Sequence, residues 1–282
     1  LTPGDLDELR DLIEAFGLAP TFLPDLSGSL DGHIPDDFTP TTIGGTGCEQ
    51  ARAMGVANWT IAIGEQMRPA AEAIKRNAGV PFRMFERATG LHACDDLVAF
   101  LSKISGQPVP RKYRRQRSQL VDAMLDGHFH IGGRRVAIGA EPDLLYAISS
   151  VLAEMGADVS CAVTTTQSPL LERLPCEQVT IGDLEDLEAG AADADLLITH
   201  SHGRQAAERL GIPLFRIGIP MFDTLGAAHL VTVGYRGSRD LIFAIGNMLM
   251  HHHHDAQPDD WRDAWAAPGN HSQAVTAKEL VP

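Results

Sequence analysis

Two cysteines of this chain occupy positions where a thiol can act as a nucleophile or a metal ligand. Cys48 follows the glycines of IGGTGCEQ and is expected in the first turn of a helix, where the helix dipole lowers the pKa of a thiol. Cys94 enters a helix in the same way in GLHACDDL, but the carboxylates of Asp95 and Asp96 disfavour a thiolate there. A free cysteine is more often a small core residue, so a buried, inert thiol is the simpler interpretation of both.

The histidines come in groups that suggest metal binding, although no group supplies a full set of ligands. His200 and His202 end an expected strand in ITHSHG, His128 and His130 flank a phenylalanine, and a run of four occupies 251–254. A mononuclear site needs three or four ligands that converge in a fixed geometry, whereas a pair two residues apart supplies two. We therefore expect polar loop residues at the strand end, and adventitious nickel or zinc binding by the run.

The loops that follow the expected strands carry no nucleotide or hydrolase motif. In an open parallel sheet, ligands gather outside the carboxyl ends of the strands. AIGAEPDLL places Gly139, Glu141 and Asp143 there, without G-x-G-x-x-G or a Walker lysine, and its carboxylates oppose a bound phosphate. No serine lies in G-x-S-x-G, and spacing alone places no acid–base pair of carboxylates. We assign no catalytic residue and no metal ligand from the sequence, and the residues that bind a cofactor remain unidentified.

Composition argues against several classes of protein. Of 282 residues, 23 are Lys or Arg and 37 are Asp or Glu, and the net charge of −14 repels nucleic acid and anionic membrane surfaces. The longest apolar run, Leu241 to Met250, is far shorter than the roughly 20 residues of a membrane span. Four scattered cysteines without a C-x-x-C pair, and no signal-peptide pattern, indicate a reducing, cytoplasmic setting. The chain opens with Leu1 rather than methionine, which suggests a fragment, or a processed or incompletely observed polypeptide.

Alternating apolar runs and helical patterns predict an α/β protein with doubly wound parallel sheets. The expected strands are PTFLPDL, NWTIAIG and VPFRMF in the first half, and RRVAIGA, DVSCAVTTT, EQVTIG, DLLITH and PLFRIG in the second. Pro108 and Pro110 mark a break between the halves. We therefore expect one Rossmann-like domain over 1–110, a second over 111–250 and a polar tail over 251–282.

Two helices of the second half carry further expectations. The basic stretch RKYRRQR, residues 111–117, is interpreted as the solvated start of a helix, which Gly127 closes in the left-handed conformation. The last helix, about 238–250, is apolar almost all round, and such a helix must be buried on several sides, within the protein or against another subunit.

The segment PLFRIGIPMFDTLGAAHLVTVGYRGSRDLIFAIGNML resembles the C-terminal signature of the nitrogenase component 1 family. It combines a strand ending in R-x-G-x-P, a phenylalanine–aspartate pair, G-Y-x-G and a long apolar helix. Upstream, GGTGCEQARAMGVANWTIAIGEQM and RRQRSQLVDAMLDGHFHIGGRRVAI are similar to the members of this family that assemble the iron-molybdenum cofactor. The AEPD tetrapeptide at 140–143, where the catalytic beta chain tends to have G-D-P-D, favours these biosynthetic members.

This resemblance implies three Rossmann-like domains, of which the present chain matches the second and third. The family's N-terminal domain, with its cysteine ligand to a bridging iron–sulfur cluster, has no counterpart here, and none of the four cysteines matches that ligand. Four residues of the signature are expected to be structural: Arg216, Pro220, Asp223 and Tyr235. Arg216 lies in an apolar context and is expected to pair with carboxylates or carbonyls. Pro220 is expected to stop the strand, and Asp223 to cap or brace the turn that leads to the helix beyond Tyr235.

The function implied by the resemblance is that of an assembly scaffold without catalytic activity of its own. It pairs with a NifE-like chain in a heterotetramer, contacts other nitrogenase maturation proteins, and holds an iron–sulfur cluster and a precursor of the iron-molybdenum cofactor within the complex. A dinitrogenase beta subunit is the near alternative. A small-molecule enzyme or binding protein that uses the cleft between two Rossmann-like lobes is the distant one, and it rests on fold analogy alone.

Overall fold

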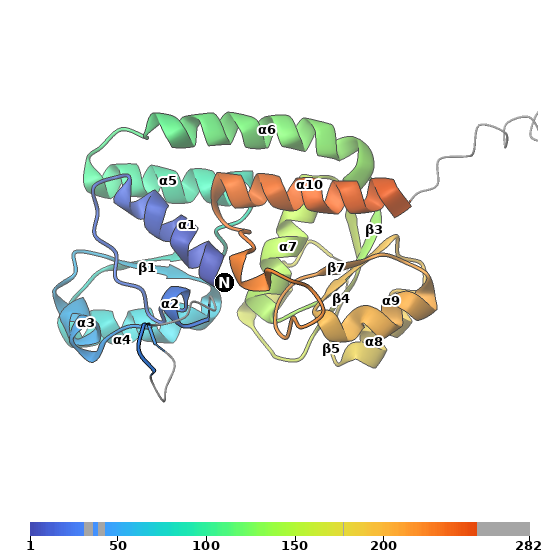
Figure 1. Ribbon diagram of the computed structural model, residues 1–282, viewed down its shortest axis with the longest axis horizontal. Helices are drawn as coiled ribbons and strands as arrows, with labels where there is room; N and C mark the ends of the chain where they lie inside the picture. Colours follow the sequence, from blue (N-terminus) through green and yellow to red (C-terminus); the bar gives the residue numbers. More distant parts are fainter. Residues whose placement is uncertain (31–35, 39–42, 177, 253–282) are drawn as a thin grey trace, which may run out of the picture.

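A computed structural model describes residues 1–30, 36–38, 43–176 and 178–252, and these residues form parallel sheets flanked by helices (Figure 1). In the first half, strand β1 (Thr60–Ile63) pairs with β2 (Phe82–Phe85) in a parallel two-stranded sheet, and helix α4 (Arg68–Ala78) makes the crossover between them. Pro69 lies in the first turn of α4 and Gly79 ends the helix in the left-handed conformation, as the sequence rules for helix ends require.

The second half contains a five-stranded parallel sheet with the order β5-β4-β3-β6-β7. Its strands are β3 (Arg135–Gly139), β4 (Asp158–Thr164), β5 (Val179–Ile181), β6 (Leu196–Thr199) and β7 (Leu214–Arg216). The helices between them are α7 (Pro142–Glu154), α8 (Leu184–Gly190) and α9 (Arg204–Leu210). The strand order reverses between β3 and β6, because the chain moves outward through β4 and β5 before it returns to the other side of β3. This reversal is the topological switch point of the sheet.

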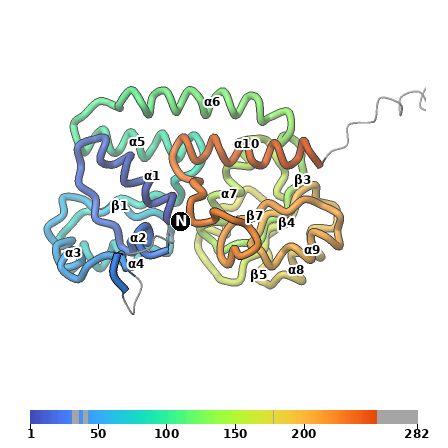
Figure 2. The backbone as a smooth tube through the Cα atoms, viewed as in Figure 1, coloured from blue at the N-terminus to red at the C-terminus, as the bar shows by residue number. Residues whose placement is uncertain are grey.

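A layer of long helices lies beside both sheets, on the same side of the molecule (Figures 1 and 2). It consists of α5 (Leu91–Ser105), α6 (Arg111–Ile131) and α10 (Gly234–His252), and α1 (Pro3–Glu14) packs next to it. The last helix, α10, runs along α6 and also contacts α5 and α1. The buried carboxylate of Asp5 fixes the approach to α10, since it accepts hydrogen bonds from the backbone N–H groups of Thr232 at 2.6 Å and Val233 at 3.3 Å.

The main hydrophobic core is shared by both halves of the chain. One cluster of buried side chains contains Leu9 and Phe85 from the first half, Ile138 and Leu152 around the large sheet, and Leu241 from α10. A smaller cluster fills the other face of the large sheet beneath α8 and α9. The boundary at residue 110 therefore does not divide the core, and the separation into domains 1–110 and 111–250 stays a prediction.

The remaining elements are short. They are α2 (Ser27–Leu30), α3 (Cys48–Ala53) and five 3-10 turns at Met54–Val56, Glu65–Met67, Pro169–Arg173, Ser201–Gly203 and Ala227–His229. No helix within the described part of the chain is long and apolar enough to cross a bilayer. Almost the whole of the expected tail, 251–282, lies outside the described residues, apart from His251 and His252 at the end of α10.

Three local expectations are wrong. PTFLPDL, residues 20–26, forms no strand, because Pro20 and Pro24 remove the N–H donors that a ladder needs. The last helix begins at Gly234, earlier than the apolar pattern indicates, since its first turn is built from small and polar residues. Gly127 does not close α6, which continues to Ile131; instead this glycine lets α6 and α10 approach closely.

We expect Gly127→Ala to destabilise the protein although alanine favours helix. A Cβ at this position would lie 2.6 Å from Cγ2 of Ile242 and 3.2 Å from the terminal methyl of Met155. Overpacking of this kind costs about 1–3 kcal/mol, which exceeds the roughly 1 kcal/mol that alanine gains over glycine in a helix. Urea unfolding should give a lower midpoint at an unchanged slope. In an Ile242→Ala background, which removes the clashing methyl, Gly127→Ala should cost less; an equal cost in both backgrounds would refute the packing explanation.

Candidate functional site

The loops at the switch point form the candidate site, because ligands of open parallel sheets gather where the strand order reverses. Glu141 follows β3, the turn Ser201–Gly203 follows β6, and the segment 217–223 follows β7. The hydroxyl of Thr199, the last residue of β6, donates to the carbonyl oxygen of Gly139 at the end of β3 at 2.7 Å. The two strands on either side of the switch point are thus tied at their carboxyl ends.

Arg216, at the end of β7, is paired with a carboxylate seven residues further on. Its Nε and Nη2 each donate to one oxygen of Asp223 at 2.8 Å. The Ser201 hydroxyl donates to Asp223 as well, at 2.5 Å, and accepts the backbone N–H of Phe222 at 3.0 Å. Hydrogen bonds from Arg216 and Ser201 lower the pKa of Asp223 to about 2, so this carboxylate stays ionised. The charge partner that the apolar context of Arg216 requires is therefore present.

The ion pair between Arg216 and Asp223 stabilises the loop formed by the end of the segment 212–223. Asp223 braces the loop after β7 through its contacts with Arg216 and Ser201, and it precedes the start of α10 at Gly234 by eleven residues. Pro220 follows a cis peptide bond with Ile219, but β7 ends at Arg216, so the strand stops before the proline and the expectation for Pro220 is wrong. Ile219, Phe222 and Leu225 expose their side chains at the surface of this loop.

An aromatic group lies beside this loop. The rings of His200 and His202 meet edge to face with centroids 5.5 Å apart, and His202 contacts Phe222 at 5.1 Å. Nδ1 of His200 is buried and has no hydrogen-bond partner among the described residues. Burial and the neighbouring His202 lower the pKa of His200, while Glu141 acts in the opposite direction.

The depressed pKa of His200 predicts a loss of stability in mild acid. The unfolded chain takes up a proton as the pH falls through about 6.5, whereas the folded chain resists protonation at this position until a lower pH is reached. Folding stability should therefore fall with the pH below that value, and His200→Gln should reduce the slope. Urea midpoints measured between roughly pH 7.5 and 5.5 test this. Equal slopes for the parent and the variant would contradict the assignment.

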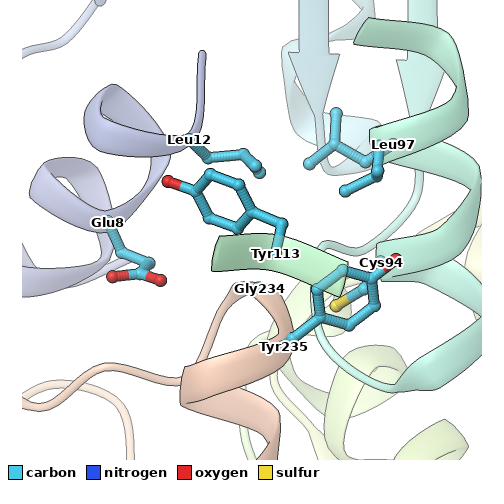
Figure 3. Close-up of a pocket in the computed structure, with 8 residues that line it drawn as sticks. Glu8, Leu12, Cys94, Leu97, Tyr113, Gly234 and Tyr235 are labelled. Atoms are coloured by element: carbon cyan, nitrogen blue, oxygen red, sulfur yellow. The ribbon is translucent and has the colours of Figure 1, made fainter. Parts of the chain in front are cut away.

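Tyr235 and Cys94 belong to a second, closed site between α1, α5, α6 and α10. The Tyr235 hydroxyl donates to Asp95 at 2.7 Å, and Arg117 pairs with the same carboxylate. Although burial alone raises the pKa of Asp95, the hydrogen bonds from Arg117 and Tyr235 bring it below its usual range. The adjacent cavity, with Tyr113, Tyr235 and Cys94 around it, has about 10 Å³, enough for roughly one water molecule (Figure 3).

The four cysteines lie in different environments, and burial disfavours the thiolate of three of them. Burial raises the pKa of the Cys94 thiol to about 12, and burial also raises the pKa of Cys161 and Cys176. Cys48 is exposed at the start of the six-residue helix α3. Within the described residues, no three His, Cys, Asp or Glu side chains are grouped so that they could hold a metal ion.

His128 and His130 lie on α6, and His251 and His252 end α10. Nδ1 of His128 lies 3.3 Å from the carbonyl oxygen of Met155, and Nε2 of His252 lies 3.1 Å from that of Gly211. His253 and His254 of the run fall outside the described residues. The described residues of this chain thus do not by themselves fit an iron–sulfur cluster.

Two carboxylates whose structural roles sequence reasoning missed join the two sheets. Asp143, in the first turn of α7, accepts the backbone N–H groups of Glu65 at 2.9 Å and Gln66 at 3.2 Å, directly after β1. Glu154, at the other end of α7, pairs with Arg87 at 2.7 Å and accepts the N–H of Leu91 at 3.0 Å. Both contacts join residues more than sixty positions apart in the chain, so no local sequence pattern predicts them.

Comparison with known proteins identifies the class to which this architecture belongs. A family model described as "Nitrogenase component 1 type Oxidoreductase" matches residues 1–250. The chain belongs to the nitrogenase component 1 family. The resemblance in the C-terminal signature and the expected α/β fold with parallel sheets are both confirmed.

Among its relatives, the nitrogenase iron-molybdenum cofactor biosynthesis protein NifN of Bradyrhizobium diazoefficiens is 60% identical over 99% of this chain and 61% of its own length. NifN of Nostoc sp. is 47% identical over 88% of this chain and 56% of its own length. A solved structure, "Nitrogenase Cp1 at pH 6.5", superimposes with a TM-score of 0.82 at 29% identity, over 89% of this chain and 58% of that one. The chain therefore spans about 60% of the length of these relatives.

Proposed function

We propose that this chain is the larger part of a scaffold subunit on which the iron-molybdenum cofactor of nitrogenase is assembled. The observation that carries the proposal is the 60% identity to a NifN protein over 99% of the chain. The near alternative, a dinitrogenase beta subunit, has less support, because the nitrogenase structure that matches is only 29% identical. The closed cavity beside Tyr113, of about 10 Å³, is too small for a substrate. It therefore gives no support to the distant alternative, a small-molecule enzyme.

On this proposal the chain acts in the cytoplasm, in a complex with a NifE-like chain and with contacts to other maturation proteins. The cluster and the cofactor precursor are held by the assembled complex, as the similarity to proteins named for cofactor biosynthesis suggests. Its own contribution is a pair of Rossmann-like units, 1–110 and 111–250, fixed to each other by a common core. It is not a catalyst when isolated.

Anaerobic co-purification with a NifE-like chain tests the proposal. The tagged chain, extended to the full length of its relatives, should retain the partner through gel filtration, and iron and acid-labile sulfide should be found in the complex. The chain alone should contain substoichiometric iron. A protein that binds no such partner, or that binds stoichiometric iron through its own thiols as an isolated chain, would show that the proposal is wrong.

A further inference from the structure

The C-terminal part of α10 borders an open groove. The groove encloses about 450 Å³, whereas the closed cavity beside Tyr113 encloses about 10 Å³. Its lining residues are Pro213, Ala244, Asn247, Met248, His251 and His252. The five residues from α10 lie three or four positions apart, so they form one continuous stripe along the helix, and Pro213 comes from the loop before β7. The groove is therefore large enough to accept side chains of another segment.

This stripe is the side of α10 that other elements leave open. The apolar pattern of the helix indicates burial on several sides, and its inner side packs against α6, α5 and α1. Ala244 and Asn247 are nevertheless exposed, and Met248 is half-buried. Within the part of the chain that the structure describes, the expected burial of α10 is therefore incomplete along the groove.

The described chain ends beside the same groove. Nε2 of His252 lies 3.1 Å from the carbonyl oxygen of Gly211, so the last turn of α10 is held against the loop that contains Pro213. Residues 253–282 follow His252 in the sequence. The chain that follows α10 therefore starts from a residue that lines the groove.

We propose that the chain's own C-terminal segment occupies this groove, with Trp261 and Trp265 as the side chains that enter it. They are two of the three tryptophans of the chain, and residues 253–282 contain no phenylalanine or tyrosine. Because they lie four positions apart, one turn of helix places both rings on the same side. Met248 offers the rings a polarisable thioether, and the exposed amide of Asn247 offers an acceptor for an indole N–H.

The connection is long enough for this return. Trp261 follows His252 by nine residues, which span up to about 30 Å when extended. The stripe from Ala244 to His252 is about 12 Å long, at roughly 1.5 Å per residue of helix. Pro258 lies between His252 and Trp261 and suits a turn in which the chain reverses its direction. The two tryptophans can therefore reach the whole stripe.

The chain's own segment also has an advantage over a separate partner. A short connection gives it an effective concentration of millimolar order, so an intrinsic dissociation constant of about 0.1 mM leaves roughly ten occupied grooves for each empty one. Occupation completes the burial that the apolar sequence of α10 requires. This inference does not depend on the proposed function.

Tryptophan fluorescence of the full chain of 282 residues tests the proposal. The third tryptophan, Trp59, packs edge to face on Phe100. In a Trp59→Phe background, which keeps an aromatic ring at that contact, the emission comes from Trp261 and Trp265 alone. Acrylamide should quench this emission weakly, because both rings are buried in the groove.

A charge placed in the groove should release the segment. Ala244→Glu adds a carboxylate to the stripe, and it opposes the aspartates that flank the two tryptophans. Acrylamide should then quench the emission at least about twofold more strongly, since most grooves are occupied before the change. Ala99→Glu makes the same change at an exposed position of α5 and should leave the quenching as in the background. Circular dichroism should show that both variants are folded.

Disulfide trapping locates the segment independently. Ala264 lies between the two tryptophans in the sequence, and Ala244 lies in the groove. In a Cys48→Ser background, which removes the exposed native thiol, Ala244→Cys and Ala264→Cys should form an intramolecular disulfide with oxidised glutathione. The pair Ala99→Cys and Ala264→Cys should remain reduced, because Ala99 belongs to α5 and does not line the groove.

Three outcomes would overturn the proposal. Equal quenching in the background and in Ala244→Glu would show that the tryptophans do not occupy the groove. Equal trapping at positions 244 and 99 would show that the segment has no preferred place on the protein. Protection from acrylamide that is lost on dilution, or a disulfide that forms only between two molecules, would assign the groove to a segment of another copy.

Discussion

Replacing Glu154 by alanine is expected to destabilise the protein by roughly 3–5 kcal/mol, the range measured when one member of a buried ion pair is removed. The side chains of Glu154 and Arg87 are 12% and 15% exposed, so little solvent is present to screen the charge that remains. Among the described residues, the substitution leaves Arg87 with one hydrogen-bond acceptor, the carbonyl oxygen of Thr89 at 2.6 Å. It also leaves the N–H of Leu91 without the carboxylate that accepts it. Because Leu91 begins α5, the loss also releases the start of that helix from α7.

Urea unfolding followed by circular dichroism measures this effect. Glu154→Gln keeps one oxygen acceptor but removes the charge, so an intermediate loss is expected. Glu49→Ala is the control, because the side chain of Glu49 is 87% exposed and forms an ion pair with Arg52 at the surface. The stability of this variant should stay within about 0.5 kcal/mol of the parent. If Glu154→Ala and Glu49→Ala had similar effects, the contact between α7 and α5 would not carry the stability assigned to it.

The second large effect is expected at Ile138, in the central strand of the large sheet. Its side chain is completely buried and belongs to the core cluster shared by both halves of the chain. Ile138→Ala should cost about 2–5 kcal/mol, and Ile138→Val about 0.5–1.5 kcal/mol, because the larger deletion leaves a cavity in a close-packed core. Since β3 ends at Gly139, the larger deletion also loosens the strand that positions Glu141 at the switch point.

Calorimetry of the two variants tests the packing around β3. A progressive loss from valine to alanine, within a single cooperative transition, is the expected result. An alanine variant that loses less than the valine range of about 1.5 kcal/mol would show that this side of the sheet relaxes into the space. Two separate transitions would show that the core is not shared between the halves.

The sequence predicts strands well where an apolar run is bounded by turn residues. β1 to β7 all fall within runs singled out by composition, because buried parallel strands are hydrophobic on both faces and leave an unbroken signal. PTFLPDL is equally apolar and fails, since its prolines remove backbone donors that a strand requires. The prediction that Gly127 ends its helix fails for another reason. The role of this glycine depends on its contact with Ile242, which lies in a helix more than one hundred positions further along the chain.

In the candidate site, too, contacts between residues close in sequence are predictable, and contacts between distant segments are not. The pairing of Arg216 was predictable in kind, because a guanidinium in an apolar run needs a charge partner, and Asp223 is near in sequence. The contacts of Asp143 and Glu154 were not predictable, because they join segments that only the completed fold brings together. The aromatic contact between His202 and Phe222 is of the same kind, since it depends on how the loops after β6 and β7 meet.

The position of α10 has a consequence for synthesis on the ribosome. Leu241 and Ile242 are translated after every strand of both sheets, yet they fill the same core as Leu9 and Phe85. The nascent chain therefore emerges with the inner side of α6 uncovered until the codons of α10 have been read, and it needs protection from aggregation during that interval. A premature stop codon anywhere before Gly234 removes the last layer of the core rather than a dispensable end.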